Sequence, residues 1–504
     1  MKVCCAALLA LASGASSHNV VQFNVTKGPP GIHVGTGPSL SRRATYSEEL
    51  INHIAGGGYF AQVKVGTPGQ VITMLLDTGS SDAWVLSHEA DLCTDQDLQD
   101  LYGTTCADTY DPSKSSTNKM VKPDGFKIVY LDGGTASGDY ITDDFSIGGT
   151  TLKSLQMACV TQAVRGTGIL GLGFSASERA AVKYPNIMDE LANQGKIGCK
   201  AYSLYLNDRR TDTGTILFGG IDTDKFIGRL EILPLHKPPD SGANYSSFEV
   251  NFASVTLTHT NGTTVTIPTS ILDHPAPAVL DSGTTLSYLP DQMAAQIYSS
   301  VGAVFDPDLR MALIDCAYLT ADPSLRFTFS FSPTARISVP VWEMVLDILS
   351  PATTPFLDTY FPSSRPCVFG IQSTAIFEDT GTVKSSAGLN FTLLGDTFLR
   401  SAYVVYDLTH HQIGMAQANL NSTTETILEL SSTGTSLPSA IGVAAQQTTF
   451  TPTSRRTVSI PSASGSENAA MGGKASGEAV MRQVMGIVAV TGLFTLFGGA
   501  LIAL

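Results

Sequence analysis

The chain has 504 residues, of which 43% are hydrophobic and 15% charged, so it is long enough for a bilobal unit and is not disordered as a whole. Its 47 glycines and 25 prolines indicate many turns and favour a β-rich fold. A formal net charge of −14 argues against nucleic acid as a partner, because an acidic surface repels polyanions.

The N-terminal region contains two predicted processing segments. Lys2, an apolar run and small residues predict a signal peptide over residues 1–15. The following stretch is rich in Gly and Pro and ends at Arg42-Arg43, so residues 16–43 are expected to form a propeptide with a dibasic cleavage site.

Six cysteines remain after removal of the signal peptide, and an even number in an exported chain predicts disulfides. Short loops favour the pairs Cys93–Cys106 and Cys316–Cys367. Cys159–Cys199 is then the pair left over, and it is the least constrained by the sequence.

From Tyr59 onward, β-branched and aromatic residues alternate with polar ones between turn residues, as in Tyr59–Val65 and Phe126–Tyr130, which predicts strands. Helical periodicity is confined to short pieces such as Ile187–Gln194 and Asp291–Val301. A Pro-rich interruption at Leu233–Gly242 indicates a connection between lobes. We therefore expect an all-β bilobal protein with an N-terminal lobe over 44–235 and a C-terminal lobe over 236–420.

The C-terminal region changes composition twice. Residues 421–468 are rich in Ser and Thr with Pro, which predicts an O-glycosylated stalk without a packed core. Residues 469–504 end in an apolar run without terminal basic residues, which is typical of a removed GPI-attachment signal. The predicted attachment site is Asn468, with Gly472 as the alternative, and a transmembrane anchor is the competing interpretation. N-glycosylation is predicted at Asn244, Asn261, Asn390 and Asn421. These features predict a secreted protein that is anchored at the cell surface.

An internal repeat carries the predicted chemistry. The segment Met74–Val85 contains Asp77-Thr78-Gly79-Ser80, and the segment Ala278–Leu289 contains Asp281-Ser282-Gly283-Thr284. Each copy is followed by a second apolar-Gly unit, namely 168–173 in the first half and 393–396 in the second. Two equivalent halves are therefore expected to contribute one carboxylate each.

The residue types in the repeat suit a pair of neighbouring carboxylates. Gly79 and Gly283 let adjacent chain approach closely. Thr78 and Ser282 can bond to the opposite strand, and Ser80 and Thr284 can donate to the carboxylates. Two carboxyl groups about 3 Å apart share one proton, so one can act as a base on water and the other as an acid toward an amide carbonyl. This chemistry requires no cofactor or metal, and His410-His411 is interpreted as a surface turn.

The pattern from about Tyr59 to Ala418 resembles the pepsin-like aspartic proteases. The resemblance implies that Asp77 and Asp281 are catalytic, that Trp84 supports the site, and that Tyr130 lies on a flap hairpin with Asp132 and Gly133 near the substrate. Leu393–Arg400 resembles a late family signature. The predicted propeptide, stalk and GPI tail make the chain similar to fungal yapsin-type surface enzymes, with the propeptide as an intramolecular inhibitor and the enzyme as a monomer.

The flap departs from the family pattern at Leu131 and at Gly133-Gly134. In some fungal relatives, an acidic residue just after the flap tyrosine permits Lys or Arg before the scissile bond. Asp132 has two competing interpretations: such a specificity residue, or a solvated turn residue in an Asp-Gly dipeptide.

Two other functions compete with an endopeptidase that cleaves proteins or peptides. A non-catalytic binding module would be expected to lose one aspartate or its hydroxyl neighbours, and both sets are present. A glycoside hydrolase would use two carboxylates on a sugar, but it would not need the twofold hydroxyl-glycine framework.

Overall fold

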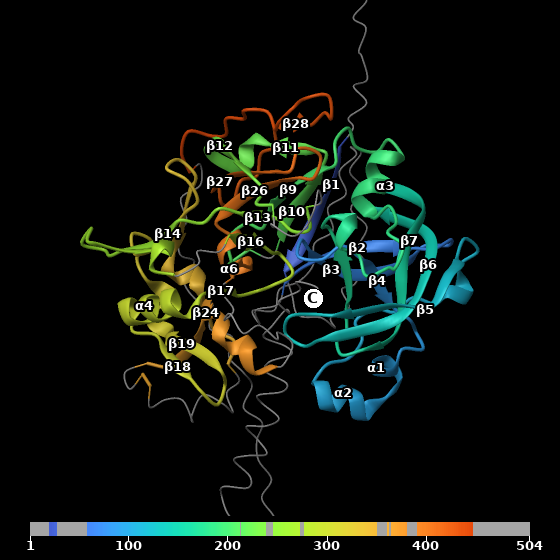
Figure 1. Ribbon diagram of the computed structural model, residues 1–504, viewed down its shortest axis with the longest axis horizontal. Helices are drawn as coiled ribbons and strands as arrows, with labels where there is room; N and C mark the ends of the chain where they lie inside the picture. Colours follow the sequence, from blue (N-terminus) through green and yellow to red (C-terminus); the bar gives the residue numbers. More distant parts are fainter. Residues whose placement is uncertain are drawn as a thin grey trace, which may run out of the picture.

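The computed structural model describes residues 20–27, 58–211, 213–237, 245–272, 277–349, 360–361, 364–380 and 391–446. The described chain forms two β-rich lobes side by side (Figure 1). The predicted strand Tyr59–Val65 is β2, with the same bounds. The all-β bilobal prediction is therefore confirmed.

A 13-stranded sheet forms the N-terminal lobe and continues to the other side of the molecule. In the N-terminal lobe the strand order is β2 (Tyr59–Val65), β3 (Gln70–Asp77), β8 (Gly168–Gly171), β4 (Ala83–Leu86), β7 (Thr150–Ala163), β6 (Thr135–Ile147) and β5 (Lys119–Val129). The remaining strands are β12 (Phe226–Pro234), β27 (Gln412–Ala418), β26 (Ala402–Asp407), β9 (Ala201–Tyr205), β10 (Thr213–Phe218) and β1 (Val21–Lys27). Because β26 and β27 come from the late part of the chain, this sheet joins strands from the two ends of the described chain.

Strand β1 falls inside the predicted propeptide. It pairs antiparallel with β10 from Val21 to Thr26, and it also pairs with β2. The predicted propeptide therefore supplies an internal strand of the sheet, between two strands of the predicted N-terminal lobe.

The described part of the C-terminal lobe contains three smaller sheets. The first is ordered β13 (Glu249–Val250), β16 (Ala278–Leu280), β25 (Thr392–Leu394), β17 (Ser287–Leu289) and β24 (Ile371–Ser373). The second is β15 (Thr264–Pro268), β14 (Ser254–Thr258), β20 (Arg326–Ser330) and β21 (Arg336–Pro340), and the third is β18 (Val304–Asp306), β19 (Met311–Asp315), β23 (Pro366–Phe369) and β22 (Val345–Leu346). Arg336–Pro340 and its neighbours alternate buried and partly exposed side chains, as expected for sheets with one buried face.

The helices are short, as predicted. The α-helices among the described residues are α1 (Asp91–Thr94), α2 (Gln96–Tyr102), α3 (Ile187–Asn193), α4 (Asp291–Val301) and α6 (Asp396–Leu399). Helix α3 begins at a capping box in which Asn186 and Asp189 bond reciprocally, and α4 ends at Gly302 with φ of 68°.

Among the described residues, no helix is both long enough and apolar enough to span a bilayer. The 3-10 helices are η1 (Pro112–Lys114), η2 (Ser175–Ser177), η3 (Thr223–Lys225), η4 (Thr269–Ile271), η5 (Cys316–Thr320), η6 (Val341–Met344) and η7 (Thr374–Thr380).

The structure contains the disulfides Cys93–Cys106 and Cys316–Cys367. The predicted Cys159–Cys199 pair is wrong, because both residues are buried free thiols. Cys159 lies on β7 in the main hydrophobic core, whereas Cys199 lies in a separate apolar cluster and its Sγ contacts Thr409 Oγ1 at 3.3 Å. Elimination among six cysteines fails when two of them serve as small buried side chains.

The prediction of an unpacked stalk from residue 421 is also wrong for the part that is described. Strand β28 (Ile427–Glu429) pairs with β11 (Gly220–Asp222), and single bridges join Ile441 to Arg229 and Val443 to Ile227. Leu430, Leu437 and Ala440 are buried in the same apolar cluster as Cys199. Residues 421–446, which we call the C-terminal strap, therefore belong to the folded body, and a predicted stalk can begin only beyond them.

Several predictions fall outside the described residues: the signal peptide 1–15, Arg42-Arg43, Asn244, Asn390, Asn468, Gly472 and the tail 469–504. Two predicted glycosylation sites are described. Asn261 is exposed in the turn between β14 and β15. Asn421, by contrast, donates its amide Nδ2 to Asp208 Oδ2 at 3.1 Å, a contact that competes with attachment of a glycan.

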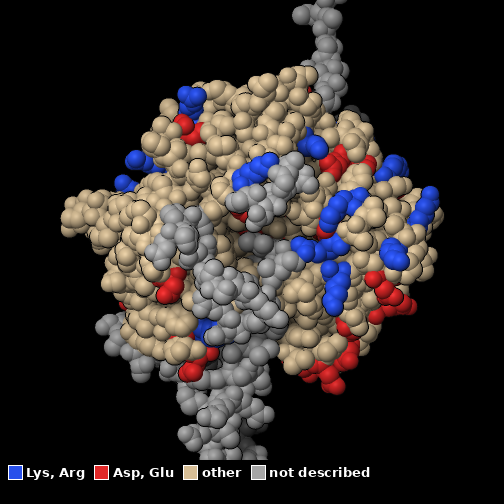
Figure 2. Space-filling model, viewed as in Figure 1, with Lys and Arg blue, Asp and Glu red and all other residues tan. Residues whose placement is uncertain are grey.

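Charge is unevenly spread on the face in Figure 2. Lys and Arg gather on the lobe that contains β5 to β7, and acidic side chains gather near α1 and α2. The helical region carries Asp91, Asp95, Asp97 and Asp100, which accounts for the acidic area.

Candidate active site

Both predicted catalytic aspartates lie at the ends of central strands. Asp77 is the last residue of β3, and Asp281 follows β16. Each of these strands runs parallel to the second unit of its own repeat: β3 pairs with β8, and β16 pairs with β25. The duplicated apolar-Gly units therefore support the aspartates from equivalent positions in the two lobes. Both side chains are fully buried.

The hydroxyl groups of the repeat cross between the lobes. Thr78 Oγ1 donates to the carbonyl oxygen of Leu280 at 2.8 Å and accepts from the backbone N–H of Ser282 at 3.0 Å. Ser282 Oγ donates to the carbonyl oxygen of Leu76 at 3.0 Å. Each half thus holds the strand that leads to the other half's aspartate, and this fixes the relative position of the two carboxyl groups.

Each carboxyl group receives the same two hydrogen bonds. Gly79 N–H donates to Asp77 Oδ1 at 2.8 Å, and Gly283 N–H donates to Asp281 Oδ1 at 2.8 Å. The outer oxygens accept from the hydroxyls of Ser80 and Thr284, the latter at 2.5 Å. The predicted roles of these residues in orienting the carboxyl groups match the contacts.

The two carboxyl groups lie next to each other. A Cβ atom on Gly79 would lie 2.7 Å from Asp281 Oδ1, so only glycine leaves room for this approach. Burial raises the pKa of both aspartates, and the charge of Asp281 raises the pKa of Asp77 further. A hydrogen bond between the side chains raises the pKa of Asp77 and lowers that of Asp281. Two adjacent carboxyl groups with raised pKa values favour a state in which they share one proton.

The predicted flap is the hairpin of β5 and β6. Its turn is closed by the backbone N–H of Tyr130 donating to Gly134 O at 2.8 Å, and by Gly133, which adopts φ of 86°. Trp84 Nε1 donates to the Tyr130 hydroxyl at 2.8 Å, so the predicted supporting tryptophan holds the flap tyrosine. The Asp77 charge contributes to raising the pKa of Tyr130, after burial, because the tyrosine lies near that aspartate.

At the flap tip, Leu131 is buried and the side chain of Asp132 is largely covered. Leu131 packs in a cluster of C-terminal-lobe residues that includes Leu286 and Tyr288. The Asp132 side chain is only 5% exposed, and it forms an ion pair with Arg165. The interpretation of Asp132 as a solvated turn residue is therefore wrong.

Two supporting residues were missed by the sequence reasoning. Arg165 lies between β7 and β8, and nothing in the local sequence links it to Asp132. Asp82 is buried, and it accepts from the hydroxyls of Tyr140 and Tyr184 at 2.9 Å each and from Arg179 N–H at 2.7 Å. Burial raises the pKa of Asp82. An acidic residue five positions after Asp77 on an apolar segment was the sequence signal that could have identified Asp82.

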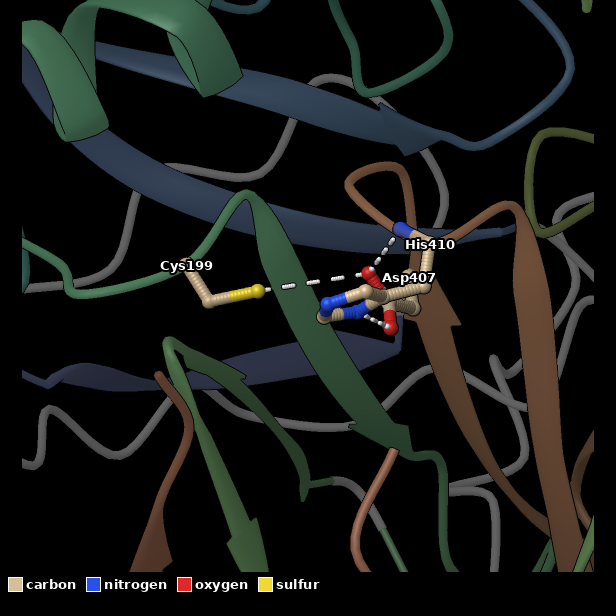
Figure 3. A group of neighbouring side chains, drawn as sticks. All are labelled: Cys199, Asp407 and His410. Atoms are coloured by element: carbon tan, nitrogen blue, oxygen red, sulfur yellow. Dashed lines mark hydrogen bonds and ion pairs between the residues drawn. The ribbon is translucent and has the colours of Figure 1, made fainter. Parts of the chain in front are cut away.

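Cys199, Asp407 and His410 form a second cluster of polar side chains (Figure 3). His410 Nδ1 lies 2.6 Å from Asp407 Oδ2, and its Nε2 lies 2.9 Å from the carbonyl oxygen of Gly434. Both ring nitrogens are thus engaged by oxygens of the protein. We interpret His410 as a link between the β26–β27 turn and the C-terminal strap rather than as a metal ligand.

The comparisons with known proteins agree with this geometry. The model of the eukaryotic aspartyl protease family matches residues 58–418. The probable aspartic-type endopeptidase OPSB of Arthroderma benhamiae is 39% identical over 432 residues, which are 84% of this chain and 80% of that protein. The protein of the same description from Aspergillus fumigatus is 37% identical over 395 residues, or 76% and 73% of the two chains. Secreted aspartic protease 8 of Candida albicans is 33% identical over 376 residues, or 75% and 79%. The chain belongs to the eukaryotic aspartyl protease family and is an aspartic-type endopeptidase.

Proposed function

We propose that the chain is a secreted, cell-surface endopeptidase that works at acidic pH through Asp77 and Asp281. The observation that carries this proposal is the pair of buried carboxyl groups that Gly79 allows to lie side by side and that receive matched donors from Gly79 and Gly283. A pair that holds one proton supplies a base and an acid at the same place, and acidic conditions preserve that state.

In the proposed reaction the ionised carboxylate removes a proton from a water molecule between the two aspartates. The water oxygen attacks the carbonyl carbon of the scissile amide, and the protonated carboxyl donates to the developing oxyanion. Collapse of the tetrahedral intermediate breaks the C–N bond, and the proton taken from water goes to the leaving amine. The hydroxyls of Ser80 and Thr284 keep the carboxyl groups oriented throughout.

The proposed location rests on the sequence and on relatives. The signal peptide 1–15 and the tail 469–504, with Asn468 as the attachment site, predict export and a GPI anchor. One relative is named a secreted aspartic protease. We further propose that residues 16–43 act as an intramolecular inhibitor in a zymogen and that the mature enzyme is a monomer.

The test of the reaction is cleavage of a peptide library at about pH 4, where a shared proton is retained. The wild type is expected to cleave, and a statine-type inhibitor is expected to stop it. Asp77→Asn and Asp281→Asn should each abolish cleavage while keeping the fold, as judged by circular dichroism. Absence of inhibitor-sensitive cleavage by folded wild type would favour a non-catalytic binding module. The location is tested separately, by release of the protein from cells with a phospholipase that cuts GPI anchors.

A further inference from the structure

The flap tip carries a largely buried ion pair that the mechanism above does not use. The guanidinium of Arg165 contacts Asp132 Oδ2, and the two side chains are 12% and 5% exposed. Asp132 Oδ1 accepts from the backbone N–H of Gly134 at 2.9 Å. The charge of Asp132 is therefore compensated from within the N-terminal lobe, before any substrate arrives.

Arg165 is held in place by its backbone neighbours. A Cβ atom on Gly166 would lie 1.9 Å from the carbonyl oxygen of Thr105, and Ala107 N–H donates to Gly166 O at 2.8 Å. The Cys93–Cys106 disulfide lies in this same contacting segment. Arg165 thus projects from a segment that is packed against a cross-linked loop, which limits its freedom to leave Asp132.

Glycine at position 134 also makes room for the ion pair. A Cβ atom there would lie 3.0 Å from Asp132 Oδ1 and 3.1 Å from Arg165 Nη2. The additional flap glycine, which departs from the family pattern, therefore coincides with the place where the guanidinium packs. This links an unusual feature of the hairpin to the presence of the arginine.

The ion pair lies close to the predicted reaction centre. The Arg165 Cζ atom is 5.5 Å from the centre of the Tyr130 ring, and Tyr130 lies near Asp77. On the opposite side, the charge of Asp132 contributes to raising the pKa of Tyr288 in the C-terminal lobe, after burial. The pair thus lies at the flap tip beside the Tyr130 ring, where the neighbouring Leu131 packs against residues of the C-terminal lobe.

We propose that the substrate residue before the scissile bond binds beside this ion pair and that Arg165 is a specificity-determining residue there. Arg165 neutralises Asp132, so the enzyme favours an apolar residue over Lys, Arg or Glu at this substrate position. A basic substrate residue would have to displace Arg165 to reach Asp132, and an acidic one would have to displace Asp132 to reach Arg165. Both displacements separate a largely buried pair of opposite charges, which opposes binding. This inference rests on the proposed function of the aspartate pair.

The experiment compares kcat/KM for peptides that differ only in Leu, Lys or Glu before the scissile bond, at about pH 5, where a free Glu side chain is mostly ionised. Arg165→Gln exposes the Asp132 charge and is expected to raise the Lys-to-Leu ratio by about tenfold or more. Asp132→Asn exposes the Arg165 charge and is expected to raise the Glu-to-Leu ratio instead. The double variant should lose both gains.

Arg165→Lys is the matched control, because it keeps the positive charge and should keep both ratios near those of wild type. A purely structural role for the ion pair predicts similar losses on all three peptides, and so unchanged ratios. The inference would be overturned if Arg165→Gln kept the wild-type Lys-to-Leu ratio and Asp132→Asn kept the wild-type Glu-to-Leu ratio, while at least one of them still cleaved the Leu peptide. The proposed function would then remain intact. Absence of inhibitor-sensitive cleavage by wild type would overturn both.

Discussion

The buried ion pair of Arg400 and Glu343 offers a sharp test of how the C-terminal lobe is stabilised. Arg400 is 1% exposed and Glu343 is fully buried. Arg400 donates from Nε to Glu343 Oε2 at 2.7 Å and from Nη2 to the Glu343 carbonyl oxygen at 2.7 Å. Glu343 Oε1 also accepts from the backbone N–H of Arg209 at 3.1 Å. Glu343 is therefore the acceptor for three donors, two of them from the buried Arg400.

Glu343→Gln removes the negative charge while keeping the side-chain volume. The Gln amide oxygen can still accept from either Arg400 Nε or the Arg209 N–H. The amide NH2 group then faces the other of these two donors, and the Arg400 guanidinium loses the negative charge of Glu343. Breaking a buried pair in this way costs about 3–5 kcal/mol. Replacing both members by apolar residues, as in Glu343→Leu with Arg400→Met, should cost less than Glu343→Gln alone, because no unpaired charge remains at this pair.

The assay is urea unfolding followed by tryptophan fluorescence, with every protein in an Asp77→Asn background so that self-digestion does not interfere. The free energy of unfolding is then compared within that common background. A loss of less than about 1 kcal/mol for Glu343→Gln, in the range of an exposed pair, would refute the reasoning. A double variant that is less stable than Glu343→Gln would refute it as well.

Three further predictions follow from the site and the strap. Burial raises the folded-state pKa of Asp77 and Asp281, so these groups make their full contribution to stability below the ordinary carboxyl pKa of about 4 and lose it as pH rises. In thermal unfolding, Asp77→Asn should therefore lose less stability than wild type between acidic and neutral pH. Equal losses would contradict this. Gly79→Ala places a Cβ atom 2.7 Å from Asp281 Oδ1, so kcat should fall by about a hundredfold with little change in KM, and an unchanged kcat would show that the carboxyl groups tolerate displacement. Ending the chain at residue 420 exposes the positions that Leu430 and Leu437 cover and should cost several kcal/mol, roughly 1.5–3 for each leucine, so a truncated protein with an unaltered melting temperature would contradict the packing of the strap.

Much of the fold and the candidate site could be predicted because the information is local or duplicated. Asp77 and Asp281 lie in two copies of one motif, and each copy is paired with its own apolar-Gly unit through a parallel strand. The helices at 187 and 291 have a clear apolar periodicity within a single segment. Local signals of this kind do not depend on knowing where distant segments lie.

The features that could not be predicted depend on contacts between distant segments. Arg165 meets Asp132 only because the loop after β7 returns to the flap. The C-terminal strap was misread because its Ser and Thr content masks a few widely spaced apolar residues, such as Leu430 and Leu437, that pack on strands more than 200 positions earlier. Burial of two thiols in separate clusters is likewise a tertiary property of Cys159 and Cys199.

For the proposed GPI-anchored enzyme, the packed C-terminal strap shortens the reach from the membrane. With an anchor on Asn468 and a tether that began at residue 421, the extended tether would span up to roughly 160 Å. Because residues up to 446 are part of the folded body, roughly 22 residues remain, which span at most about 75 Å. An enzyme anchored in this way would act within a layer close to the lipid surface, so its accessible substrates would be those that come within that layer.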